Sequence, residues 1–289
     1  MTFRILLATV LLAPFSAVAA TAAQIELLQS PAWLVRGGQE EPLTRAAELR
    51  SGDIIRTGNR ARVRIGLTEG SDLKIGPSAR VELPRLQAPE QESGIFESLV
   101  EIVRGAFRFT TGQLGVDRRR DLEFRVGAVV AGIRGTDIWG KAAADRDFVV
   151  LIEGEIEVGT GEPSGRLDEP GTAYIQPKDG DAIPSEPIAM ATIREFAQET
   201  EPVGERGRLT PDGRWRVMLD SLRERSRAQA ALARYRAAGY PVELESVGID
   251  GRDWHRIVLA GAPSRESARA WAAEFERRFD VRSPWLRRE

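Results

Sequence analysis

Apolar and polar residues alternate in short runs between residues 24 and 180, and most runs end at Gly, Pro, Asn or Asp. Alternation puts every second side chain on the same side of an extended chain, so each run predicts a β-strand. The predicted strands span 62–67, 72–76, 79–83, 106–112, 122–133 and 148–160. Helical patterns are lacking between them, which argues against a parallel βαβ sheet. We therefore predict an all-β domain, a sandwich, barrel or solenoid, over residues 24–180.

The pattern changes after residue 213, where segments with apolar residues at every second position alternate with segments in which they recur about every 3.6 residues. The order of predicted elements is β-α-β-β-α-β, which is typical of an α+β, ferredoxin-like domain over residues 213–289. These elements span 214–222, 226–239, 240–247, 254–261, 264–279 and 283–288. Residues 181–212 are rich in proline and are predicted as a linker that contains one short helix at 188–199. The fold class is therefore multidomain.

The first residues have the pattern of a secretory signal peptide, predicted over residues 1–22. Arg4 precedes an apolar run at 5–13, and small residues follow it. We expect cleavage after Ala19 or Ala22. The run is short for a membrane span, which needs about 20 residues, although a retained anchor is the alternative. We expect a periplasmic protein with no stable membrane insertion after cleavage.

Composition excludes several kinds of site. The sequence has no cysteine and one histidine, His255, which excludes disulfides, thiolate nucleophiles, cysteine-ligated zinc and a His-rich metal site. We expect no metal and no cofactor. From residue 206 onward the chain has 18 arginines against 12 acidic residues, a net charge of +6, whereas the remainder carries −8. This division favours two modules with different partners.

Three features resemble catalytic or phosphate-binding sites. His255 has Asp253 nearby but no identified nucleophile. Glu153, Glu155 and Glu157 would share one face of the predicted strand at 148–160, and paired carboxylates hydrolyse glycosides in some enzymes. A row of acids on a strand is more often its solvated side. The glycines of 132–137 lack the lysine of a phosphate loop, so they predict a turn. We predict no catalytic residues, with a hydrolase as the alternative.

Alternation in the predicted strand 254–261 separates two faces. His255, Ile257 and Leu259 share the face that the helices must cover, whereas Trp254 and Arg256 share the open face. The residues predicted on the open face are Trp254, Arg256, Arg216 and Met218. A tryptophan ring beside guanidinium donors suits a sugar chain, whereas packing of Trp254 on the linker or on the other domain is the alternative. RNA-binding modules also use such a face, but export and nearby acidic residues argue against nucleic acid.

The N-terminal part resembles the FecR family. The pieces "SGDIIRTG" (51–58), "VRGAFRFTTG" (103–112), "GIRGTD" (132–137) and "EGEIEV" (153–158) appear in the family's order, over about residues 48–176. The resemblance implies a β-rich extracytoplasmic domain. Signalling members also carry a sigma-factor-binding segment and one membrane helix before it, and neither is evident here. We therefore expect a module that interacts with an unidentified envelope protein, with a regulatory or sensor role in envelope signalling as the alternative.

The C-terminal part is similar to SPOR domains over residues 213–289, through "WRVMLDSL", "ARYRAAGYPVEL" and "DWHRIVLAGAPSRESARAWAAEF". The resemblance implies binding of septal peptidoglycan whose glycan strands have lost their stem peptides, and so a role in the cell envelope and cell division. The sequence departs from the family's pattern at Met218, Asp220, Leu222 and Val258. The predicted glycan-binding residues are Trp254, Arg256, Arg216, Met218 and Val258.

Overall fold

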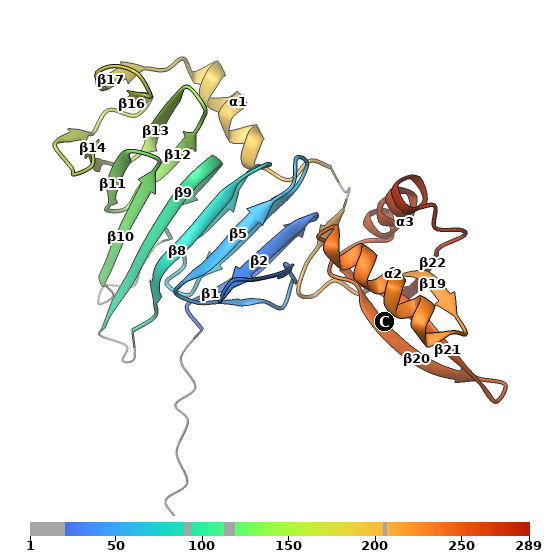
Figure 1. The fold of residues 1–289 in the computed structure, drawn as a ribbon. Helices are drawn as coiled ribbons and strands as arrows, with labels where there is room; N and C mark the ends of the chain where they lie inside the picture. The colour runs from blue at the N-terminus through green and yellow to red at the C-terminus, as the bar shows by residue number, and fades with distance from the viewer. Residues whose placement is uncertain (1–20, 90–93, 113–118, 205–206) are drawn as a thin grey trace, which may run out of the picture.

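The computed structural model describes residues 21–89, 94–112, 119–204 and 207–289 (Figure 1). The predicted signal peptide, residues 1–22, lies outside the described residues except for its last two. The chain has two parts, and strands dominate the N-terminal part, as the alternating pattern predicts. Among the described residues, no helix has both the length and the apolar character needed to cross a bilayer.

The N-terminal part consists of two β-sheets that share strand β9 (Ile95–Thr110). The first sheet holds β1 (Ala23–Gln29), β4 (Glu48–Leu49), β6 (Arg62–Leu67), β7 (Asp72–Ile75), β12 (Asp137–Ala142), β13 (Arg146–Glu153), β16 (Thr172–Pro177), β17 (Ile183–Pro187) and β18 (Arg208–Leu209). The second holds β2 (Ala32–Arg36), β3 (Gln39–Pro42), β5 (Asp53–Thr57), β8 (Arg80–Gln87), β10 (Arg119–Val126), β11 (Val129–Ile133), β14 (Ile156–Thr160) and β15 (Gly165–Leu167).

Strand β9 crosses from one sheet to the other at Gly105. Its first half pairs with β8 and β10, and its second half pairs with β7 and β12. Gly105 has a φ of 92°, and a Cβ atom there would lie 2.6 Å from Ala79, so only glycine fits this crossing. Beyond it, Phe107 and Phe109 point into the core and contact Phe124 of β10, with ring centroids 5.2 Å and 4.7 Å apart. The core therefore lies between the two sheets.

Two of the predicted strands are hairpins. The predicted strand 122–133 turns at Gly127, and the predicted strand 148–160 turns at Gly154, both of which have positive φ. The apolar pattern runs through each turn because both arms are buried, so alternation alone does not reveal the turn. Glu153 therefore ends β13 whereas Glu157 lies in β14, and Glu155 forms an ion pair with Arg166. The prediction that the three acids share one strand face is wrong.

Helix α1 (Met190–Thr200) packs on the outer face of the first sheet, which confirms the short helix predicted at 188–199. The Phe196 ring stacks on Trp139 of β12 with centroids 4.6 Å apart, and Ile193 is buried beside them. With β17 before it and β18 after it, this helix fills most of the segment 181–212 that was expected to be a linker.

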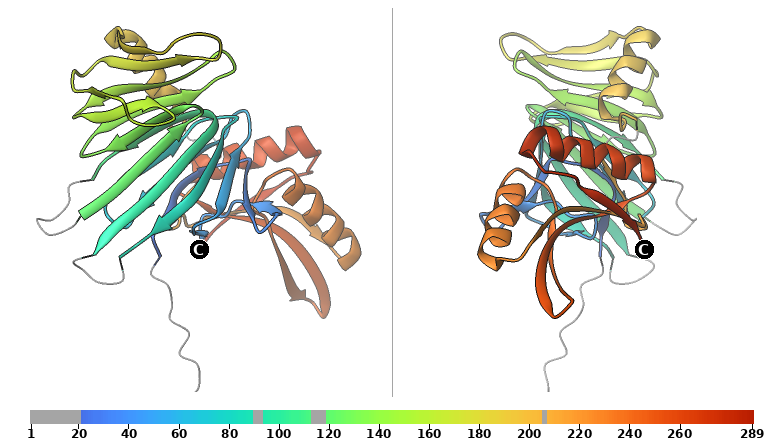
Figure 2. Two further views of the ribbon diagram at one scale, coloured as in Figure 1. Left: turned by 60° about the vertical axis from the view of Figure 1, so that its left-hand side comes forward. Right: turned by 90° about the vertical axis from the view of Figure 1, so that its right-hand side faces the viewer.

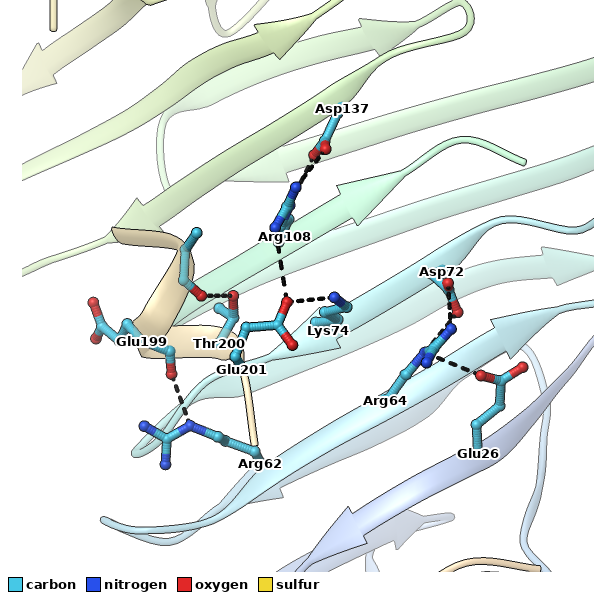
Figure 3. A network of polar contacts seen from close by, with 11 residues as sticks. Glu26, Arg62, Arg64, Asp72, Lys74, Arg108, Asp137, Glu199, Thr200 and Glu201 are labelled. Carbon is cyan, nitrogen blue, oxygen red and sulfur yellow. Dashed lines mark hydrogen bonds and ion pairs between the residues drawn. The ribbon is translucent and has the colours of Figure 1, made fainter. Parts of the chain in front are cut away.

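Charged residues hold the C-terminal end of α1 on the same sheet (Figure 3). Lys141 Nζ lies 2.8 Å from a carboxylate oxygen of Glu199, and Lys74 pairs with Glu201. Arg108 lies 3.7 Å from the same Glu201 carboxylate. Arg62 donates to the Glu199 carbonyl, and Arg108 also pairs with Asp137. Arg64 forms a separate group with Glu26 and Asp72 on the same sheet. The chain therefore leaves the first sheet at a fixed point before it enters the C-terminal part.

The C-terminal part has the predicted element order, and its four strands form an antiparallel sheet in the order β20-β21-β19-β22. Its elements are β19 (Trp215–Leu222), α2 (Arg225–Ala237), β20 (Glu243–Ile249), β21 (Arg252–Ala262), α3 (Arg265–Phe279) and β22 (Trp285–Arg288). Tyr235, Tyr240, Trp271, Phe275 and Phe279 form an aromatic cluster between the helices and the sheet. The Ser264 side chain caps α3 by accepting a hydrogen bond from the Ser267 backbone N–H.

The two parts pack directly against each other (Figure 2). Gly239, just after α2, lies against the ring of Trp33 in β2, and its carbonyl accepts a hydrogen bond from Ala32 N at 3.2 Å. Arg45 donates to the carbonyl of Pro211 at 2.5 Å. Strand β18 pairs with β1, and its Arg208 carbonyl accepts a hydrogen bond from Trp271 of α3. The C-terminal part is thus joined to the N-terminal part through side chains, backbone and a shared strand.

Candidate functional site

The strand register of the C-terminal sheet defines which side chains share its open face. Directly paired residues point to the same side of a sheet. Arg256 pairs with Glu245 on one side and Ser221 on the other, and Trp254 pairs with Val247. Met218 pairs with both Val258 and Trp285. None of these residues belongs to the core clusters. We call the surface made by Trp254, Arg256, Arg216, Arg287, Glu245 and Trp285 the open face.

The open face carries two tryptophans, each with an arginine over its ring. Arg256 lies 5.4 Å from the centroid of Trp285, and Arg223 lies 5.0 Å from that of Trp254. Guanidinium groups stack on indole rings because the ring face is electron-rich. The Arg256 Nε atom has no hydrogen-bond partner within the described part of the chain. The face therefore combines flat apolar rings with planar cationic donors.

Trp285 was not among the predicted site residues, although 42% of it is exposed. The sequence predicts a strand at 283–288 but does not give its register against β19. Once Trp285 is paired with Met218, it must lie on the same side as Arg256. Alternation within β22 also places Arg287 on this side, opposite Arg216. The signal in the sequence was a tryptophan within the predicted strand 283–288.

Two predicted glycan-binding residues, Met218 and Val258, do not reach the surface. They lie on the side of the sheet that alternation predicts, but their exposed fractions are 1% and 0%. The reason is that longer side chains lie over them. Arg216 extends from β19 across the intervening strand β21 to pair with Glu245 of β20, and Trp285 stands beside Met218. The prediction that Met218 and Val258 contact a glycan is therefore corrected. These two side chains form a buried apolar floor under the open face.

Arg216 is not a free donor. Its guanidinium pairs with Glu245 through Nη2 and with Glu289 through Nη1, the latter at 2.9 Å, and only 15% of its side chain is exposed. Its Nε atom has no partner among the described residues. Sequence reasoning treated this residue as an open donor because the paired acids lie 29 and 73 positions away in the chain. A ligand that binds Arg216 must therefore compete with carboxylates already in place.

A β-bulge in β19 changes which residues follow Met218 on the open face. Met218 pairs with Val258, but the next paired residue is Asp220, opposite Ile257, so Leu219 lies in the bulge. Asp220 therefore points toward the helices, where it accepts a hydrogen bond from the Tyr235 hydroxyl at 2.6 Å. Burial and this hydrogen bond raise the pKa of Tyr235. Asp220 is thus part of the internal structure.

The single histidine lies on the other side of the sheet from Trp254, as predicted. His255 pairs with Leu222 and Ser246, and its Nδ1 atom lies 2.9 Å from the Ser246 hydroxyl. The segment 132–137 forms the predicted turn between β11 and β12. Among the described residues, no group of three His, Asp or Glu side chains is arranged to hold a metal ion. The best-organised chemistry in the described chain is therefore that of the open face.

A cleft of about 670 Å³ borders the open face at the junction of the two parts. Glu243 and Ala260, which pair with Val258 and Arg216 respectively, form one side of it, and Trp33 contributes to the other. The open face therefore continues to the boundary with the N-terminal part.

Comparison with known families gives two matches. Residues 53–157 match the model described as FecR protein, and residues 211–285 match the model described as SPOR domain. Both matches occur in the predicted order, within the predicted ranges apart from two residues at the start of the second. Both families are non-catalytic and belong to the bacterial envelope. A search of curated proteins found no match.

Two solved structures of a proposed anti-sigma factor from Parabacteroides distasonis are similar to this chain. One has a TM-score of 0.39 at 11% identity, and the alignment covers 69% of this chain and 96% of the other. The second has a TM-score of 0.38 at 14% identity, with coverage of 79% and 92%. Likeness at this level shows neither function nor partner.

Proposed function

We propose that this chain, which carries a FecR region followed by a SPOR domain, is a non-enzymatic periplasmic protein that binds glycan strands of peptidoglycan through its open face. The observation that carries the proposal is the pair of tryptophans on one face of the sheet, Trp254 and Trp285, with the Arg256 guanidinium over the Trp285 ring. The C–H faces of sugar rings pack on indole, and guanidinium forks donate to hydroxyl and carboxylate oxygens. This combination fits a polysaccharide better than an apolar ligand.

The proposed ligand is a glycan strand that has lost its stem peptides. Hydrolysis of the amide bond that links a stem to the lactyl group leaves a carboxylate on the sugar. The open face presents Arg256 and Arg287 to such a group, and guanidinium–carboxylate pairs are among the stronger polar contacts in proteins. A bare, anionic strand therefore matches the open face in charge.

Three further parts of the proposal rest on sequence and topology. The pattern of residues 1–22 supports export to the periplasm. The strand order β20-β21-β19-β22, with both helices on the core side, supports a ferredoxin-like class for the C-terminal domain. Binding of stem-free strands supports enrichment at the division septum, which fluorescence localisation of the full chain would test. A diffuse periplasmic signal would contradict the septal role.

The match of residues 53–157 to FecR favours a second candidate function, which is regulation in envelope signalling. In this alternative, the N-terminal domain contacts an envelope protein and passes on the state of the C-terminal domain. The direct packing of the two domains supports such a role, because a rigid junction orients one surface relative to the other. Cross-linking in cells distinguishes the alternatives. If one inner-membrane regulator is the main protein cross-linked to this chain, signalling is favoured. If many envelope proteins are cross-linked, a scaffold is favoured.

Retention on amidase-treated sacculi tests the main proposal. The full chain should sediment with them, and Trp254→Ala, Arg256→Ala and Trp285→Ala should each reduce the retained fraction. Arg227→Ala is the matched control, because Arg227 is highly exposed on α2 and removes the same charge away from the open face. Equal retention of the wild type and the three open-face variants would refute the assignment of the site.

A further inference from the structure

The ion pairs of Arg216 have the geometry of an occupied anion site. Nη1 and Nη2 each pair with a different carboxylate, from Glu289 and Glu245, and these acids come from opposite edges of the sheet. Glu245 belongs to β20, whereas Glu289 follows β22. The two terminal nitrogens of this guanidinium are therefore placed to bind carboxylates on the open face.

A second arginine lies beside Arg216 without such partners. Arg287 of β22 pairs in register with Arg216 of β19, so both side chains lie on the open face. Arg287 is exposed, and in the described part of the chain it forms no ion pair. Two adjacent guanidiniums repel each other unless an anion lies between or beside them. The Glu289 carboxylate, on Arg216 Nη1, supplies one negative charge at this place.

We propose that Arg216 and Arg287 form a carboxylate-binding subsite, and that the Glu289 side chain occupies it when no ligand is bound. The inference rests on the proposed function and extends it, because it names the pair of arginines that takes the free lactyl carboxylate and the side chain that the carboxylate displaces. Glu289 is the residue that leaves. Its side chain is 52% exposed, against 32% for Glu245, and its backbone is held by one hydrogen bond to the Arg214 carbonyl.

Exchange of one carboxylate for another keeps the charge of the subsite constant. The ligand carboxylate accepts from Arg216 Nη1 and from Arg287, and Glu289 moves into water. Glu245 stays on Nη2 and keeps Arg216 extended across β21, so the buried floor of Met218 and Val258 remains covered. The subsite therefore selects strands with free carboxylates over strands whose lactyl groups are amidated by stem peptides.

The test measures the affinity of the full chain for stem-free glycan oligomers and for the same oligomers with their carboxyl groups amidated. Removing the competing charge in Glu289→Gln should tighten binding of the carboxylate form by up to about fivefold, the range for an exposed ion pair. Arg287→Ala should weaken it, and neither variant should change binding of the amidated form. Glu276→Gln is the matched control, since Glu276 is exposed on α3 and the charge change is the same.

The outcomes separate this inference from the proposed function. If the wild type binds the oligomers but Glu289→Gln binds them equally or more weakly, the subsite is refuted and the proposed function stands. Equal gains on carboxylate and amidated oligomers also refute it, because the effect would then be one of general charge. If the wild type binds neither form, the proposed function fails and the subsite fails with it.

Discussion

The junction between the two domains depends on a glycine that no other residue replaces without cost. Gly239 has a φ of 84°, and a Cβ atom there would lie 2.7 Å from two ring carbons of Trp33 and 2.9 Å from Pro31. Carbon atoms in contact are normally about 3.5–4.0 Å apart. In Gly239→Ala the two domains must therefore separate by about 1 Å at this point, as the difference between those contacts requires.

Two costs add in this variant. A left-handed backbone costs a non-glycine residue about 1–2 kcal/mol. Overpacking against Trp33 costs about 1–3 kcal/mol more. Gly251→Ala separates the two, because Gly251 has a φ of 70° in the hairpin between β20 and β21, and nothing lies within 4 Å of its missing Cβ. The expected loss of unfolding free energy is about 1–2 kcal/mol for Gly251→Ala and about 2–5 kcal/mol for Gly239→Ala.

Urea unfolding followed by tryptophan fluorescence measures both losses. A double-mutant cycle strengthens the test, because in a Trp33→Ala background the ring that Gly239→Ala meets is absent. There Gly239→Ala should cost less than in the wild-type background but still more than Gly251→Ala, because the contact of the new Cβ with Pro31 remains. Equal losses for the two glycine variants in the wild-type background would refute the packing of Trp33 on Gly239, and with it the rigid junction.

Two other predictions concern stability. Arg108→Ala removes a bidentate pair with Asp137, whose side chain is 11% exposed, and should lower the unfolding free energy by about 1.5–3 kcal/mol. Arg146→Ala, in an exposed pair, should change it by less than about 0.5 kcal/mol, and equal losses would contradict this account. Burial and hydrogen bonds to carboxylates raise the pKa of Tyr235 and Tyr240, so the folded state holds these protons more tightly than the unfolded state. This stabilisation is complete below about pH 10 and is lost as the pH rises further. Tyrosinate absorbance should therefore appear for these residues only as the near-ultraviolet circular dichroism is lost, and ionisation in a folded domain would contradict the assignment.

Alternation predicted β6, β7 and β8 because each has one buried face, but it missed β1, β2, β5, β12 and β16. It predicted β6 to the residue and gave the element order of the C-terminal domain. It did not reveal the turns at Gly127 and Gly154, where both arms of a hairpin are apolar. It also gave no strand partners, so the crossing of β9 between two sheets was not predictable. Pairing of strands far apart in the chain is a tertiary property that a local pattern does not contain.

The sequence predicted on which face of the sheet the candidate site residues lie, but not their burial or their ion pairs. Alternation placed Trp254 and Arg256 on the open side of the sheet, where the register confirms that they share a face with Trp285. It placed Met218 on that side too, but it did not predict that longer side chains would cover this residue. The ion pairs of Arg216 join strands that are distant in sequence, so only the folded sheet brings them together.

Binding of stem-free glycan by the open face can be measured directly. Calorimetric titration of the full chain with stem-free glycan oligomers, compared with oligomers that keep their stems, reads affinity without a reporter. We expect binding of the stem-free form, weaker binding of the form with stems, and loss of most of the binding heat in a Trp254→Ala/Trp285→Ala variant that remains folded. Absence of heat with the wild type, or equal heat with the folded double variant, would contradict this expectation.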